Sequence, residues 1–552
     1  MLTLAPSNVV VQVPSSRATL YKLQTVQAVL PLLSSSAEEV QEAAARAVEK
    51  LSRMPAAAVA VRRAEGIPLL IDLMSSRDEE VQLAAISAVM NVAHSDPKAA
   101  ASIRDADGLR PLVTFLTAAN VQIQIAACTA LLGCSKNEAN KTLIRELGAI
   151  DLLLKMLPFT NARDAQAAAV ACLAFLTLNE DDARILLRLQ GGMRKLQALL
   201  YANDPILQSH AAEVFAHCAP NKDSRIAMRL ADCLAPLVGL LSSPHAAART
   251  AAAGALMQGT QATRTNQVKC RELGAIAPLL RLLEPPEEGP PDREAQRRGV
   301  WTLSNIACEP QAAKQLRQSP SGFAPLILLI AGGDPILQRP ASACLFNASA
   351  NDLGAPTAIE NTDGLPALVS ALAYADTDEH HEIVASSAGV LLNCAAQAGM
   401  ANTIVDTQPS VLSRLFACVK LTEHVPQVAN AIGALMNITA ESHVAVDTMI
   451  GGATHLNLLF SVLPSMREEA SVRTISPDLP RFRDAPCLTV SLRVCAPLGL
   501  RCAATWPDAS PTCASTSPAA NSSHRSPACA ISSKLSRHPR TTPRAARAAW
   551  PS

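Results

Sequence analysis

The feature of this sequence that most constrains its fold is a period of about 42 residues. A long Ala-rich helical phrase, VQLAAISAVMNVA at 81–93, returns along the chain. We call the place held by Asn91 the ladder position; it recurs at steps of 41 to 47 residues, at Lys50, Gly133, Ala174, His217, Gln258, Asn305, Asn347, Asn393 and Asn437. A chain of 552 residues exceeds a single hydrophobic core, which stops growing at roughly 250–300 residues. The period therefore predicts about ten similar units, each covering an apolar side of its neighbour.

Each unit is predicted to hold three helices. A glycine precedes a short stripe of apolar residues spaced three and four apart, which is the period of a helix. In the first clear copy, Gly66 is followed by Ile67, Leu70, Ile71 and Met74. Because glycine suits a sharp turn, we expect a turn before this medium helix. A polar turn leads to the long helix, and a short segment such as 97–104 begins the next unit.

The repeated phrases resemble the armadillo family. The resemblance is carried by ELGAIAPLLRLL at 272–283, VWTLSNIA at 300–307 and ALMNIT at 434–439, and it covers about 20–464. It implies an all-α, right-handed solenoid of about ten three-helix repeats whose long third helices line a concave face. We therefore expect an N-terminal extension at 1–19, the solenoid with a partial eleventh repeat at 20–464, and a low-complexity, disordered or aberrant tail at 465–552.

Two segments interrupt the period. The 47-residue step contains the Pro- and Gly-rich segment 284–292, which predicts a surface loop between the second and third helices of one unit. This loop is either a binding element or a tolerated insertion. Near the end, Leu456, Leu459, Phe460 and Leu463 repeat the medium-helix stripe, but no period follows Thr474. The residues after it arise either from an altered reading frame or splice form, or from a genuine basic tail.

Charge and composition narrow the class of partner. From Met466 onward there are 12 Lys and Arg against 5 Asp and Glu, which leaves 36 basic and 42 acidic residues in the rest. A mildly acidic body disfavours nucleic acid as a ligand. No apolar run approaches the ~20 residues of a membrane span, so direct insertion is not expected. The cysteines of the helical body form no CxxC pair and are interpreted as small buried apolar residues in a reducing compartment.

A candidate binding surface follows from the ladder position. Asn occupies it in four successive units, and its short amide can both donate to and accept from the backbone of an extended peptide. Arg297 and Trp301 lie on the same predicted face as the first of these asparagines, and Arg339 has the matching place in the next unit. The predicted groove residues are Arg297, Trp301, Asn305, Arg339, Asn347, Asn393 and Asn437. Alternatively, each Asn ties its helix to a neighbouring helix, and Trp301 is a packing residue.

Three function classes are compatible with these features. The favoured one is a non-enzymatic, monomeric scaffold or adaptor that binds extended protein segments and needs no cofactor. It would act in the cytoplasm, with a nuclear or a cytoskeletal and ciliary site as alternatives. A Trp–Asn pair four residues apart also resembles the cargo groove of importin-α, which suggests a nuclear-import receptor. The third is a fragment of a U-box ubiquitin ligase with armadillo repeats, although no segment is left over for a U-box.

Catalytic and metal motifs are weak. The sequence has no Gly-rich phosphate loop, no GxSxG and no HExxH. His380, His381 and Glu382 are adjacent and suggest a metal site, but they fall in a predicted polar turn, where solvated side chains are the commoner outcome. We therefore expect no catalytic residue and no metal.

Overall fold

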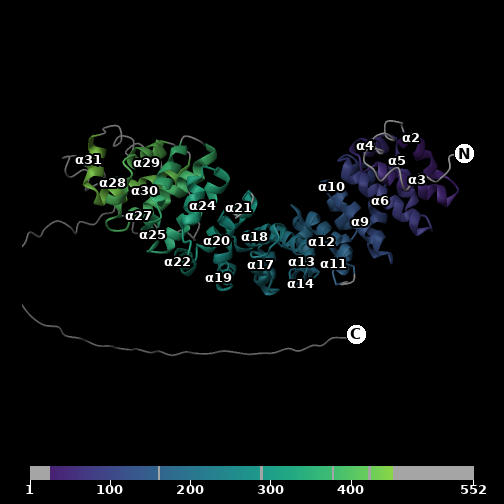
Figure 1. Ribbon diagram of the computed structural model, residues 1–552, viewed down its shortest axis with the longest axis horizontal. Helices are drawn as coiled ribbons and strands as arrows, with labels where there is room; N and C mark the ends of the chain where they lie inside the picture. Colours follow the sequence, from purple (N-terminus) through teal and green to yellow (C-terminus); the bar gives the residue numbers. More distant parts are fainter. Residues whose placement is uncertain (1–24, 159–161, 286–289, 376–377, 421–423, 452–552) are drawn as a thin grey trace, which may run out of the picture. The chain divides into compact units, whose positions relative to one another are not determined.

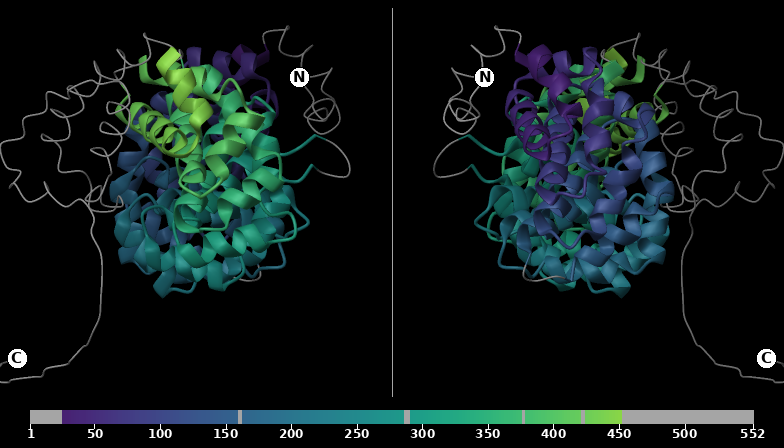
Figure 2. Two further views of the ribbon diagram at one scale, coloured as in Figure 1. Left: turned by 90° about the vertical axis from the view of Figure 1, so that its left-hand side faces the viewer. Right: turned by 90° about the vertical axis from the view of Figure 1, so that its right-hand side faces the viewer.

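The computed structural model describes residues 25–158, 162–285, 290–375, 378–420 and 424–451. All of them lie within Met1–Ala485. The described residues form α-helices and short 3-10 helices and contain no strand (Figures 1 and 2). The predicted all-α class is confirmed. The expected extension at 1–19, the partial eleventh stripe and the tail from 465 lie outside the described ranges.

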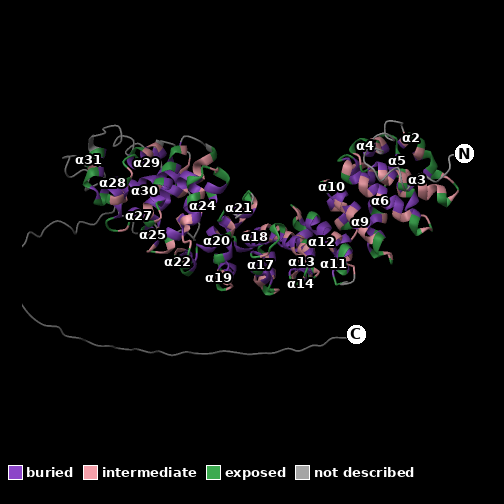
Figure 3. Ribbon diagram, in the orientation of Figure 1, coloured by how far each residue is buried: buried purple, intermediate pink, exposed green. Residues whose placement is uncertain are grey.

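A long third helix is present in every predicted unit. These helices are α3 (Glu38–Leu51), α6 (Glu79–Ser95), α9 (Val121–Cys134), α12 (Arg163–Thr177), α15 (Pro205–Cys218), α18 (Ala246–Thr260), α21 (Arg293–Ile306), α24 (Pro335–Asn351), α27 (His381–Ala395) and α30 (Val425–Glu441). Each packs against the next in series, from α3 against α6 to α27 against α30. These helices are largely buried between their neighbours, and many of their buried residues are alanines (Figure 3).

Two shorter helices complete each unit. The first helices are α4 (Pro55–Arg63), α7 (Ala99–Asp105), α10 (Glu138–Glu146), α13 (Asp181–Leu189), α16 (Lys222–Leu230), α19 (Arg264–Glu272), α22 (Pro310–Gln318), α25 (Ala355–Asn361), α28 (Met400–Thr407) and α31 (His443–Gly451). The second helices are α5 (Gly66–Leu73), α8 (Leu109–Thr114), α11 (Ala149–Met156), α14 (Gly192–Leu199), α17 (Leu234–Leu240), α20 (Ile276–Leu283), α23 (Ala324–Ala331), α26 (Gly364–Ala371) and α29 (Val411–Lys420). The described part begins with α2 (Thr25–Val29) and a 3-10 helix, η1 (Leu30–Ser34), in the second-helix place before α3.

Side-chain caps and a repeated glutamine fix where the third helices start. Asp78, Asn120 and Asp334 accept hydrogen bonds from backbone N–H groups of the first turn. The fourth residue of most third helices is Gln, and its amide donates to a carbonyl at the end of the preceding helix or in the turn after it. Gln82 Nε2 donates to Ser76 O over 2.7 Å, and Gln338 Nε2 donates to Ile330 O over 2.6 Å. The same donation recurs at Gln41, Gln124, Gln166, Gln208 and Gln296.

Glycine is required before the second helix for one of two structural reasons. Gly148 itself has a left-handed backbone, with φ of 81°, as the predicted turn requires. In other units the left-handed residue is the one before the glycine, for example Asp363 with φ of 52°. A Cβ on Gly364 would then lie 2.7 Å from Ile359 Cγ2 and 2.9 Å from Ile327 Cδ1. Glycine is needed there for close packing against the preceding unit.

Two further expectations can be compared with the structure. Segment 284–292 does connect a second helix, α20, to a third helix, α21, and residues 286–289 of it are not described. The cysteines of the helical body are buried except Cys308, as predicted. Burial raises the pKa to about 12 at Cys128, Cys134, Cys218, Cys233, Cys270 and Cys394. These thiols therefore stay protonated and serve as packing groups.

Candidate partner-binding surface

The third-helix surface consists of the partly exposed side chains that α3 to α30 present beside the ladder position. Four successive third helices place Asn305, Asn347, Asn393 and Asn437 on it, and all four are half-buried. The equivalence inferred from the sequence alignment is therefore real in space.

Each ladder asparagine donates its amide to the preceding third helix. Asn305 Nδ2 lies 2.9 Å from Met257 O, and Asn347 Nδ2 lies 2.9 Å from Ser304 O. Asn437 Nδ2 donates to Leu392 O over 3.0 Å, whereas Asn393 Nδ2 donates to Ser349 Oγ over 2.9 Å. The earlier Asn91 follows the same pattern with Glu49 O. The amide nitrogens thus link neighbouring units, which is the alternative role considered from the sequence.

The amide oxygens of these residues are used differently. Among the described residues, the Oδ1 atoms of Asn305, Asn347, Asn393 and Asn437 accept no hydrogen bond. An amide oxygen has two acceptor positions and can receive a backbone N–H. The four side chains therefore combine a structural donor with an open acceptor on one surface.

Trp301 and Arg339 are brought together at the junction of α21 and α24, and Arg297 lies one turn before Trp301 on α21. The guanidinium carbon of Arg339 lies 5.8 Å from the centroid of the Trp301 ring, in cation–π range. Arg339 also forms an ion pair with Glu382 at the start of α27. The Trp301 ring is half-buried, so one part of it remains accessible.

Arg297 is held by a carboxylate of its own helix. Its Nε and Nη2 donate to the two carboxylate oxygens of Glu294 over 2.8 and 2.6 Å. Hydrogen bonds from Arg297, and after it from Arg298, lower the pKa of Glu294 to about 2. The bond to Glu294 raises the pKa of Arg297. Arg297 therefore presents a compensated charge rather than a free cation.

A groove opens on the third-helix surface at α3, α6 and α9, where the sequence predicted no site residue. It has a volume of about 280 Å³, and its lining includes Arg46, Glu80, Leu83, Met90 and Ile125. Arg46 bonds to Glu80 on the next third helix over 2.6 Å, so charged residues border an apolar floor. In the sequence, the one feature that could have indicated this groove is the partly polar stripe beside Asn91 on the third helix. The residues of the groove come from three successive units, and their meeting depends on tertiary packing.

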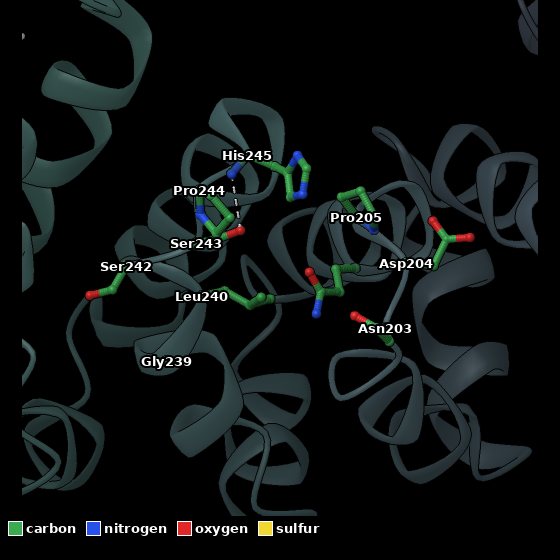
Figure 4. Close-up of a pocket in the computed structure, with 10 residues that line it drawn as sticks. Asn203, Asp204, Pro205, Gly239, Leu240, Ser242, Ser243, Pro244 and His245 are labelled. Carbon is green, nitrogen blue, oxygen red and sulfur yellow. Dashed lines mark hydrogen bonds between the residues drawn. The ribbon is translucent and has the colours of Figure 1, made fainter.

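Two other places carry less chemistry. A shallow pocket of about 270 Å³ lies between the turns that precede α15 and α18 (Figure 4). Its polar groups are engaged in helix starts, because Asp204 accepts from Ile206 N and Ser243 Oγ accepts from His245 N. At the other place, the rings of His381 and His424 lie 3.6 Å apart, and burial, followed by the charge of His381, lowers the pKa of His424. Within the described ranges, no three potential ligands are grouped to hold a metal ion.

Comparison with known families identifies the repeat. The family model of the armadillo/beta-catenin-like repeat matches residues 55–94, which hold α4, α5 and nearly all of α6. The repeat is of the armadillo type. The resemblance inferred from the sequence is thereby confirmed, and the member of the family is unspecified. An armadillo-type scaffold supports a role in protein interaction, and such solenoids are typically non-enzymatic. None of the described helices combines the length and apolar character needed to cross a bilayer.

Individual relatives of this armadillo chain are distant. It is 31% identical over 156 residues to outer dynein arm-docking complex subunit 2 of Bos taurus, a match that spans 28% of this chain and 15% of that protein. An engineered protein solved by the Northeast Structural Genomics Consortium has a TM-score of 0.68 at 27% identity, covering 76% of this chain and 99% of its own. A second engineered protein from that consortium has a TM-score of 0.41 at 29% identity, covering 43% and 96%.

Proposed function

We propose that this armadillo-repeat chain is a scaffold that holds an extended segment of a partner protein along the third-helix surface. The observation that carries the proposal is the series of open amide oxygens at Asn305, Asn347, Asn393 and Asn437. An extended segment presents unpaired backbone N–H groups at a regular spacing, and these acceptors are suited to meet them. Trp301 with Arg339, and the groove at α3 to α9, would contact its side chains.

The nuclear-import alternative has less support. An importin-α-like groove requires Trp–Asn pairs in several units, and this chain has one. Four residues before Asn91, Asn347, Asn393 and Asn437 stand Ser87, Ala343, Gly389 and Gly433. A Cβ on Gly389 would lie 2.5 Å from the Phe346 ring, so that place is already filled by a neighbouring side chain. The described helices neither favour nor oppose the ubiquitin-ligase alternative.

The relative suggests which assembly to test first. Since the similar bovine protein is a subunit of an outer dynein arm-docking complex, we propose that this chain acts as an adaptor in a comparable cytoskeletal, ciliary assembly. A tagged full-length chain expressed in ciliated cells should then localise to the axoneme. Uniform cytoplasmic or nuclear signal would contradict this assignment without affecting the scaffold proposal.

Site-specific photo-crosslinking tests the binding surface. A photoreactive amino acid at Ala343, on the third-helix surface, should crosslink a partner segment, whereas the same group at Lys314, on first helix α22, should not. The double variant N347A/N393A should abolish the crosslink from Ala343. It removes two open Oδ1 acceptors, and alanine has no amide that could rotate to bind the segment in another way. The variant must retain its circular dichroism spectrum.

The outcomes separate the two roles of the asparagines. If N347A/N393A lowers only the stability and leaves the crosslink intact, the amides are structural and the proposal fails. If Lys314 crosslinks the same segment as strongly as Ala343, the segment does not follow the third helices.

A further inference from the structure

Arginines form a regular series on the first helices. Arginine is the second-last residue of the first helix in seven consecutive units, at Arg62, Arg104, Arg145, Arg188, Arg229, Arg271 and Arg317. Six of the seven approach a side-chain oxygen near the start of the next first helix. Arg145 lies 3.2 Å from Asp182, and Arg271 lies 2.8 Å from Glu309. The others approach Asp96, Asn140, Asp223 and Asp352.

Arg229 is the exception in this series. The next first helix, α19, starts with Arg264 and Thr265, where α13 and α16 have an aspartate as second residue. The nearby hydroxyl of Thr263 accepts from Arg225 Nε over 2.9 Å. Within the described ranges, Arg229 forms no hydrogen bond or ion pair, and its Nε is buried. The protein therefore leaves one cation of the series without a counter-charge.

Exposed apolar residues lie at the ends of the two first helices α13 and α16, and one of them, Leu230, directly follows Arg229. Leu189 and Leu230, the last residues of α13 and α16, are 69% and 70% exposed. Ile185 and Ile226 precede them by one helical turn, and α13 packs against α16. In the units on either side, the last residue of the first helix is polar: Asp105, Glu146, Glu272, Gln318 and Asn361. Among these first helices, only α13 and α16 therefore end in an apolar residue.

We propose that Ile185, Leu189, Ile226, Leu230 and Arg229 form a second docking surface, for a partner-protein segment that carries apolar side chains one helical turn apart and a carboxylate. Charge complementarity argues for this occupant, since the other arginines of the series each have an oxygen partner and Arg229 requires one from outside. Exposed leucines on two adjacent helices supply apolar area around it. The surface lies on first helices and does not depend on the third-helix proposal.

A pair of peptides tests the proposal on the full chain. The probe is a short fluorescein-labelled helical peptide with leucines at i and i+4 and one glutamate beside them, and its control has glutamine in place of the glutamate. By fluorescence anisotropy, the glutamate peptide should bind about two- to fivefold more tightly, as expected for a partly exposed charge pair. Arg229→Gln should remove this preference, and so should Thr265→Asp, which supplies an internal carboxylate.

Leucine variants complete the experiment. L189E/L230E should abolish binding of both peptides, whereas Leu353→Glu, at a leucine that is 95% exposed elsewhere, should leave binding unchanged. Equal binding of the two peptides to the unaltered chain would overturn the proposal, as would binding retained by L189E/L230E. A concentration-dependent dimer in sedimentation that L189E/L230E dissociates would assign this surface to a second copy of the chain instead.

Discussion

At the residue scale, the ladder position shows how one side chain type serves packing first. Asn347 Nδ2 donates to both the carbonyl and the hydroxyl of Ser304, 43 positions earlier in the chain. In α15 the ladder residue is His217, and its Nδ1 makes the same kind of link to Ala174 O over 2.8 Å. Either side chain therefore connects two units, although only Asn leaves an amide oxygen open.

Removing one such link should have a small, measurable cost. We expect Asn347→Ala to lower the free energy of unfolding by about 1 kcal/mol, the net contribution of a typical hydrogen bond. Urea denaturation followed by circular dichroism measures this change. Asn361→Ala, at an exposed residue whose side chain makes no hydrogen bond within the described residues, is the matched control and should change the stability by less than about 0.5 kcal/mol. Equal effects would show that the amide link contributes nothing.

His217 should make the chain sensitive to acid. Burial lowers its pKa, so the unfolded chain binds a proton more readily than the folded one. The corresponding stability is present above the ordinary histidine pKa of about 6.5 and is lost as the pH falls toward the lowered value. His217→Asn, which restores the common ladder residue, should reduce the fall in melting temperature between neutral and mildly acidic pH. An unchanged pH dependence would contradict this assignment.

At the element scale, much of the architecture could be predicted because it depends on local periodicity. The long helices, the medium-helix stripes and the buried cysteines all follow from apolar residues spaced three and four apart. The groove at α3 to α9 and the oxygen partners of the arginine series could not be predicted, because each contact joins residues of different units. The prediction that glycine forms the turn before each second helix was only partly right, since Asp363 rather than Gly364 has the left-handed backbone.

The glycines that start second helices should differ from other helical glycines. We expect Gly364→Ala to destabilise the chain by about 1–3 kcal/mol, because its Cβ would overlap the side chains of Ile359 and Ile327. Gly239→Ala in α17 meets no atom within 4 Å and should be neutral or stabilising by up to about 1 kcal/mol. Thermal unfolding of the two variants checks the difference. A neutral Gly364→Ala would show that neighbouring side chains yield easily.

At the scale of the whole molecule, stability should be divided among junctions. Each third helix packs against the one before and the one after it, so a local defect should weaken its own junction most. The Arg317–Asp352 pair is one such link, between α22 and the turn that joins α24 to α25, and the Asp352 side chain is only 10% exposed. Loss of the arginine would leave a largely buried carboxylate without its counter-charge.

Hydrogen exchange can locate such a defect. We expect Arg317→Ala to accelerate amide exchange in α22 to α25 by about tenfold or more, with α3 to α9 unaffected. Mass spectrometry of peptic peptides gives this resolution. Uniform acceleration over the described helices would instead mean that the chain opens as one cooperative body.

The buried cysteines have a practical consequence. Cys128, Cys172, Cys218, Cys344 and Cys394 lie in five different third helices, and a side chain packed there can be alkylated only after its own unit has opened. Cys308 is exposed and should label at once. The order in which the five buried cysteines become modified under native conditions would give the order in which their units open. The native cysteines therefore report local unfolding without any engineered label.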